Sequence, residues 1–210
     1  MSKTDNSNVN AKLLLRRHFL RKYHMDEPPS VFDCCQGGGV MWSVLRKQFT
    51  VKSYWGVDLK PKPGRLKIDS VDVLANTGWR FDVIDVDTYG SPWRHFDQIL
   101  RNGTTDCTVF LTIGNQNTSA MSPNAHGGEF VNFPPRTPPS LRAKVLRRFS
   151  VSWLLARSCE FGKMVVEAVE SVSDGGARYV AARLEVKRAA AVDAATALDS
   201  PANKEQGNGR

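Results

Sequence analysis

The chain has 210 residues, is 41% hydrophobic and carries a formal net charge of +8. This length and apolar content suit one α/β domain with a sizeable core. Residues 1–10 are polar, and no apolar run approaches the ~18 residues of a membrane helix, so neither a secretory signal nor a membrane span is expected. The four cysteines lack disulfide or metal-site spacing. We therefore expect free thiols in a soluble, cytoplasmic protein.

The first part of the chain, residues 1–30, is predicted to form a basic helix and a linker. The helix is expected over 11–25, with Leu13, Leu14, Phe19 and Leu20 partly toward the apolar interior and the arginines outside. Two consecutive prolines at 28–29 end this helical pattern and lead into the next element.

Between residues 31 and 187, strand-like runs alternate with helix-like segments, which favours a doubly wound, mostly parallel α/β sheet. An antiparallel hairpin is expected from 164 to 186, followed by a flexible tail at 188–210. The stretch 115–139 is long for a loop, which is typical of a lid or a substrate-binding loop. The other strands are predicted at 31–35, 53–59, 66–69, 81–86 and 108–113, and helical segments at 40–49, 71–76, 91–102 and 141–159.

A glycine cluster, Gly37-Gly38-Gly39, separates the first predicted strand from the helix that follows it. Strand, glycine turn and helix in this order are typical of nucleotide-binding sites, because a backbone without Cβ atoms lets a ligand approach closely. Closing an ordinary loop is the alternative role of such a turn.

Acidic residues stand at the ends of the first three predicted strands, where ligands bind in doubly wound sheets. Asp58, about 20 residues after the glycine turn, is a candidate to accept hydrogen bonds from both ribose hydroxyls. Asp69 could accept from an adenine amino group, with Asp72 as a competitor, and Asp33 could orient the glycine loop or face an amino group of the ligand. For Asp58, a position in a surface turn is the alternative.

The fourth predicted strand ends in the sequence Asp85-Val86-Asp87-Thr88-Tyr89-Gly90-Ser91-Pro92-Trp93. A carboxylate here could accept hydrogen bonds from an exocyclic amine, while Tyr89 or Trp93 could stack on a flat base. The alternative is that Asp85 or Asp87 caps the next helix, for which Ser91 is also available.

In this order, the glycine turn and the strand-end acids resemble the class I S-adenosylmethionine-dependent methyltransferases, over residues 31–186. The octapeptide 85–92 is similar to the Asp-x-Asp-Pro-Tyr-Gly signature of tRNA guanine-N2-dimethyltransferases, with Thr88 in place of the proline. The resemblance implies a Rossmann-like sheet of seven strands that ends in the antiparallel hairpin. It also implies S-adenosylmethionine as the cofactor and methyl transfer to an exocyclic amino group of a nucleic-acid base.

The resemblance also implies roles for individual residues. The cofactor-binding residues would be Asp33, Cys35, Gly37, Gly39, Asp58 and Asp69, with Cys35 at the position of the family motif's first glycine. Asp87 would accept from the target amine, with Tyr89 closing the pocket and Asp85 as a further catalytic candidate. Trp93, Asn115 and His126 are candidates for substrate binding, and no metal site is expected because the four histidines are scattered.

Basic residues are concentrated at 12–22 and 136–148, which favours a nucleic-acid partner over a membrane. A solvated basic surface is the alternative, in which case the substrate would be a protein or a small molecule. A cofactor-binding module without catalysis is a further alternative. A nicotinamide-dependent oxidoreductase ranks last, because the G-x-G-x-x-G spacing is absent: Trp42 stands at the sixth position. The small size of the chain also suggests a partner subunit or a homo-oligomer.

Overall fold

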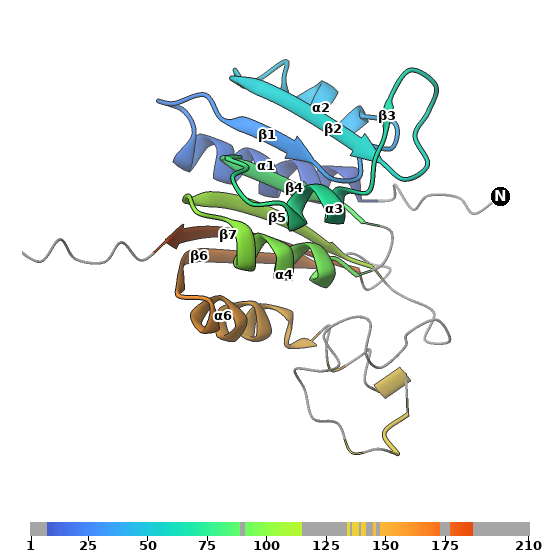
Figure 1. Cartoon of the computed structure of the whole chain (residues 1–210), viewed down its shortest axis with the longest axis vertical. Coiled ribbons are helices and arrows are strands. Elements are labelled where there is room, and N and C mark those ends of the chain that lie inside the picture. Colours follow the sequence, from blue (N-terminus) through green and yellow to red (C-terminus); the bar gives the residue numbers. More distant parts are fainter. Residues whose placement is uncertain are drawn as a thin grey trace, which may run out of the picture.

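The computed structural model describes residues 8–88, 91–114, 134, 136–138, 140–141, 145, 148–172 and 177–186. Seven strands form one sheet in the order β3-β2-β1-β4-β5-β7-β6. The first five strands of this order run parallel, and β7 is antiparallel to both of its neighbours. The predicted mostly parallel seven-stranded sheet with a C-terminal antiparallel hairpin is therefore confirmed (Figure 1).

The strands are β1 (Ser30–Asp33), β2 (Ser53–Asp58), β3 (Leu66–Lys67), β4 (Val83–Val86), β5 (Cys107–Ile113), β6 (Lys163–Val172) and β7 (Arg178–Val186). The helices are α1 (Val9–Tyr23), α2 (Val40–Leu45), α3 (Ser70–Ala75), α4 (Trp93–Asn102) and α6 (Ser150–Glu160). The helix predicted over 141–159 therefore corresponds to α6 from Ser150 onward. Most of the predicted loop at 115–139, the hairpin turn at 173–176 and the tail at 188–210 lie outside the described residues.

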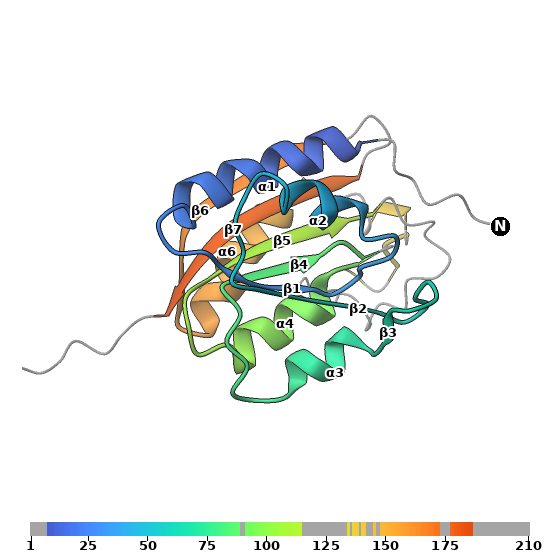
Figure 2. The ribbon, with the colours of Figure 1, turned by 90° about the horizontal axis from the view of Figure 1, so that it is seen from above.

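Helices cover both faces of the sheet (Figure 2). The face under α1 and α2 has a core that includes Phe19, Val31, Trp42, Val83 and Phe110. The opposite face, under α3, α4 and α6, has a core that includes Phe32, Ile84, Phe96, Val109 and Leu154. Strand residues alternate between the two cores because successive side chains of a strand point to opposite faces.

This alternation decides where the strand-end acids lie. Val31 belongs to the core under α1 and α2, and Phe32 to the opposite core, so Asp33 returns to the α1 and α2 face. The same reasoning on β4 takes Val83 and Asp85 to that face and Ile84 to the other. The acids are thus directed toward the N-terminal helix.

No helix within the described ranges is long and apolar enough to cross a membrane.

Candidate active site

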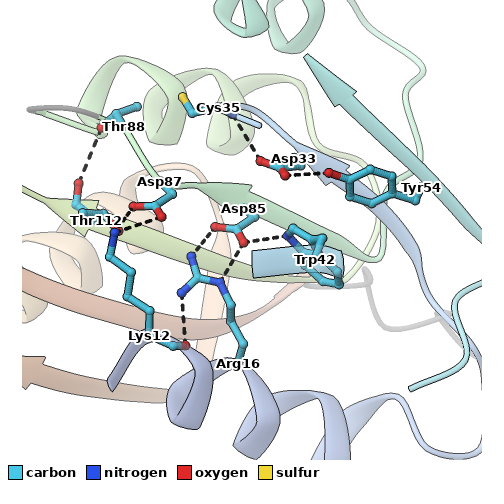
Figure 3. Close-up of polar contacts among 10 residues, drawn as sticks. All are labelled: Lys12, Arg16, Asp33, Cys35, Trp42, Tyr54, Asp85, Asp87, Thr88 and Thr112. Carbon is cyan, nitrogen blue, oxygen red and sulfur yellow. Dashed lines mark hydrogen bonds and ion pairs between the residues drawn. The ribbon is translucent and has the colours of Figure 1, made fainter. Parts of the chain in front are cut away.

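The carboxyl ends of β1, β2 and β4 meet at one edge of the sheet and bring four acids together: Asp33, Asp58, Asp85 and Asp87. Asp33 on the central strand β1 is in register with Gly56 of β2 and with Asp85 of β4. Figure 3 shows Asp33, Asp85 and Asp87 on the side of the sheet that faces α1. In a doubly wound sheet this edge is where ligands bind.

The glycine turn requires glycine at two positions. Gly37 and Gly39 have φ angles of 48° and 65°, a region in which side chains with a Cβ are strained. Gly39 is also the N-cap residue of α2, and a Cβ there would collide with the Arg65 guanidinium. The cluster therefore forms a tight backbone turn between β1 and α2, as its sequence predicts.

Asp58 connects this turn to the segment after β2. One carboxylate oxygen accepts from Gly37 N at 2.8 Å, and the other accepts from Lys60 N at 2.8 Å. Each carboxylate oxygen has a second lone pair, so both can still accept from a ribose hydroxyl. The predicted role of Asp58 in ribose binding is compatible with this geometry and stays a prediction.

Asp33 is buried, with 4% of its surface exposed. Its carboxylate accepts from the Tyr54 hydroxyl at 2.7 Å and from Cys35 N at 3.3 Å. Burial and the neighbouring Asp85 charge raise the pKa of Asp33 to about 7. Within the described part of the chain no lysine or arginine forms an ion pair with Asp33. This carboxylate is therefore poised to ionise when a cationic ligand group arrives.

The replacement Asp33→Asn tests this assignment through the pH dependence of stability. The pKa of Asp33 is raised in the folded state, so folding favours the protonated form, and its contribution to stability is lost as pH rises from about 4 to about 7. We therefore expect the free energy of unfolding of the variant, relative to that of the wild type, to rise by about 2 kcal/mol from pH 5 to pH 8. Urea unfolding of both proteins at the two pH values measures it.

Taking the difference between the two proteins cancels the titration of other buried groups. Two of these are His24 and His95, in each of which burial lowers the pKa to about 4. A difference in stability that is the same at pH 5 and pH 8 would mean that Asp33 does not change its ionisation over this range.

Asp85 is committed to an internal ion pair. Its two carboxylate oxygens accept from Arg16 Nε at 2.7 Å and Arg16 Nη2 at 2.5 Å, and one also accepts from Trp42 Nε1 at 2.8 Å (Figure 3). The Arg16 and Asp85 side chains are 2% and 1% exposed. The expectation that the arginines of the first helix lie outside is therefore wrong for Arg16, because Asp85 provides a buried counter-charge. Asp85 is thus placed to fix α1 on β4 rather than to contact a substrate.

Asp87 follows β4 and is held by the same helix. Lys12 Nζ lies 2.6 Å and 2.9 Å from its two oxygens, and the carboxylate side chain is 23% exposed. Burial alone would raise the pKa of Asp87, but the charges of Arg16 and Lys12 outweigh it and lower the pKa below its ordinary value. Asp87 is therefore an ionised, partly exposed hydrogen-bond acceptor at the carboxyl end of β4.

The alternative that these acids cap α4 is not what the structure shows. The N-cap residue of α4 is Pro92, without a side-chain cap, and Asp85 and Asp87 bond to α1 instead. Ser91, which was available as a cap, does not cap the helix either, since its buried Oγ has no hydrogen-bond partner within the described ranges.

The remaining predicted site residues fall into three groups. Cys35 is half-buried at the glycine turn, and burial raises its pKa above the ordinary thiol range. Asp69 is the N-cap of α3 and accepts from Val71 N at 2.8 Å, which leaves its other oxygen for a ligand. Trp93 is only 5% exposed and packs on Trp153, with 4.1 Å between the centroids of the two rings, so its predicted stacking on a base is not supported. Tyr89, Asn115 and His126 lie outside the described residues.

Sequence reasoning missed four residues of this site: Lys12, Arg16, Trp42 and Tyr54. One signal was available for the first two. Arg16 falls inside the apolar stripe of the helix, three residues before Phe19 and four before Leu20, and Lys12 lies one turn earlier on that stripe. A charged residue in such a stripe requires a buried partner, but the sequence alone does not identify which acid provides it.

No family model matches the sequence, and no match was found among curated proteins. Solved structures do match the fold. Trm1 from Pyrococcus horikoshii, solved with S-adenosyl-L-methionine, is 14% identical with a TM-score of 0.57; the match covers 85% of this chain and 54% of that one. TYW2 from M. jannaschii, in complex with AdoMet, is 10% identical with a TM-score of 0.55, over 88% of this chain and 78% of that one.

A putative methyltransferase from Escherichia coli, yhhF, is 11% identical with a TM-score of 0.51, and the match covers 89% of each chain. The chain has the class I S-adenosylmethionine-dependent methyltransferase fold. It spans about half the length of the Trm1 structure and most of the length of yhhF. In this methyltransferase fold, the glycine turn and the acids at the ends of β1, β2 and β4 lie together at one edge of the sheet.

Proposed function

We propose that the protein is an S-adenosylmethionine-dependent methyltransferase that methylates an exocyclic amino group of a nucleic-acid base. The observation that carries the proposal is the arrangement around the glycine turn. Asp58 accepts from Gly37 N of the turn, and Asp33, which forms no ion pair within the described residues, lies at the end of the strand that leads into the turn. A cofactor that carries an ammonium, a sulfonium and a ribose fits these two carboxylates. The Trm1 and TYW2 structures of this fold contain that cofactor.

In this proposal each residue at the edge of the sheet has a distinct task. Asp33 accepts a hydrogen bond from the amino group of the cofactor, Asp58 from its ribose, and Asp69 from its adenine. When bound, the cofactor would supply an electrophilic methyl group on its sulfur for transfer to the nitrogen, with the carbon–sulfur bond as the bond broken. Positioning the two reactants provides most of the rate acceleration.

Asp87 is the residue proposed to act on the target amine. Its ionised carboxylate accepts a hydrogen bond from the amine, which directs the nitrogen lone pair toward the methyl group. Lys12 uses only part of the acceptor capacity of the carboxylate, since two oxygens offer about four lone-pair sites. The proton lost from nitrogen passes to solvent, because Asp87 is partly exposed and its lowered pKa makes it a poor base. Tyr89, two residues further on, is proposed to close the pocket.

Nucleic acid is the substrate class that the charge of the chain favours. The formal net charge is +8, and the octapeptide 85–92, which begins inside β4, resembles a signature of enzymes that methylate a base amine in tRNA. The basic stretch 12–22 contributes less to this argument than its sequence suggests, because Lys12 and Arg16 pair with acids inside the protein.

Two measurements test the proposal. Calorimetric titration should show binding of S-adenosylmethionine and none of NAD. Incubation with methyl-labelled cofactor and bulk tRNA, rRNA or DNA should then label one nucleic acid. Label that appears only in protein or in small metabolites would instead support the other substrate classes. Cofactor binding without transfer to any of these substrates would support a non-catalytic module.

A further inference from the structure

The segment between β2 and β3 carries a concentration of positive charge that the site described above does not use. We call residues 59–67 the β2–β3 arm. It contains four cations and no acid, and Lys60, Lys62 and Lys67 are exposed while Arg65 is half-buried. Figures 1 and 2 show the arm, with β3 at its end, projecting beyond the sheet at the edge toward which β1 and β2 point. This is the edge that holds the acids.

The arm directly adjoins the glycine turn. Arg65 Nη2 donates to the carbonyl oxygen of Gly38 at 2.9 Å. Lys62 Nζ lies 3.4 Å from the position that a Cβ on Gly38 would occupy. The amide of Lys60, at the start of the arm, donates to Asp58. The positive charges therefore border the position proposed for the cofactor.

Several cations of this protein are paired with acids of the same chain. Lys12, Arg16, Lys22, Arg101, Arg157 and Arg178 all form ion pairs. Within the ranges that the structure covers, none of the four arm cations does. Four like charges within eight residues repel one another, and Pro61 and Pro63 limit how far the backbone can separate them. A polyanion would relieve this repulsion by neutralising the charges and releasing its own counterions.

We propose that the β2–β3 arm binds phosphate groups of the nucleic-acid substrate and so brings a base to Asp87. The inference rests on the proposed function, and it assigns substrate binding to a segment other than the basic stretches at 12–22 and 136–148. A phosphodiester backbone fits the arm because several phosphates in a row match several exposed cations in a row. The two exposed leucines of the arm, Leu59 at 59% and Leu66 at 50%, offer apolar contact to sugars or bases.

The test replaces three lysines of the arm by glutamine, Lys60→Gln, Lys62→Gln and Lys67→Gln, and leaves Arg65 in place because it contacts the glycine turn. A matched control, Arg21→Gln, Lys47→Gln and Lys52→Gln, removes the same charge from exposed positions in the last turn of α1 and between α2 and β2. Fluorescence anisotropy with labelled tRNA and with duplex DNA measures affinity from 50 to 300 mM salt.

We expect the arm variant to bind its nucleic acid at least about 10-fold more weakly than the control variant does. The slope of the logarithm of its binding constant against the logarithm of the salt concentration should be smaller in magnitude, by about 2, than that of the wild type. Calorimetry should show unchanged binding of S-adenosylmethionine. Equal losses in the two variants would mean that only overall charge matters and would overturn the inference. A loss confined to cofactor binding, or to binding of an acidic protein, would also overturn it.

The wild type separates failure of this inference from failure of the proposed function. If the wild type methylates a nucleic acid and the arm variant binds that substrate as well as the control does, only the role of the arm is wrong. If the wild type binds S-adenosylmethionine but labels no nucleic acid, the proposed substrate class is wrong, and the role of the arm is wrong with it.

Discussion

Replacing Asp87 by alanine is expected to lower the turnover number for methyl transfer by at least about 100-fold, while S-adenosylmethionine still binds. The carboxylate is proposed to accept from the target amine, and alanine offers no acceptor. Asp87→Asn should retain a part of the activity, because the amide oxygen accepts one hydrogen bond. Steady-state transfer assays and calorimetry on the same preparations measure both properties. Equal losses of turnover and of cofactor affinity in Asp87→Ala would instead indicate collapse of the site.

Lys12 provides the matched control, because the same ion pair can be broken from its other side. Lys12→Met keeps the Asp87 carboxylate but removes one of the two cations that lower its pKa. The pH below which activity falls should therefore move upward in Lys12→Met and stay near the wild-type value in Lys12→Arg. A purely structural role of Lys12 would reduce activity equally at every pH.

Replacing Arg16 by methionine is expected to lower the free energy of unfolding by about 3–5 kcal/mol. The change removes the two guanidinium hydrogen bonds to Asp85 and leaves that carboxylate buried with only the bond from Trp42 Nε1. A loss of this size is a large fraction of the stability of a typical domain. Chemical denaturation of the wild type and the variant at neutral pH measures it.

Two further variants separate the ion pair from other effects of the substitution. Adding Asp85→Asn to Arg16→Met removes the buried charge and keeps an acceptor for Trp42, so the double variant should recover a part of the lost stability. Arg21→Met, at an exposed position of the same helix, should change stability by no more than about 0.5 kcal/mol. A double variant less stable than Arg16→Met would contradict the assignment of the loss to the unpaired carboxylate.

The sequence predicts the order of strands and helices because its signals are local. Alternating apolar runs, the proline pair before β1 and the glycine cluster each act within a few residues, and the strands of the structure begin within two residues of the predicted positions. The final hairpin follows from the same local patterns. The sequence also predicts that acids gather at one sheet edge, since parallel strands all end there.

The pairings inside the site could not be predicted in the same way. Arg16 and Asp85 are 69 residues apart, and Lys12 and Asp87 are 75 apart, so neither pair has a local spacing signal. Trp93 illustrates the opposite error: its place after the β4 motif suggests stacking on a substrate, but the packing of α4 on α6 buries it against Trp153. Tertiary contacts, rather than the local motif, decide such positions.

The placement of α1 has a consequence for the order in which the protein is assembled during synthesis. Among the described elements, this helix leaves the ribosome first, yet it packs on β6 and β7, which leave it last. Tyr23 and His18 bond to Glu167 of β6, and Lys12 lies over the ring of Tyr179 on β7. A nascent chain that has reached only β5 thus has all four strand-end acids but only a part of the surface on which α1, with Lys12 and Arg16, packs. Its site would be completed only after the last hairpin closes, which makes this a slow, non-local step in folding.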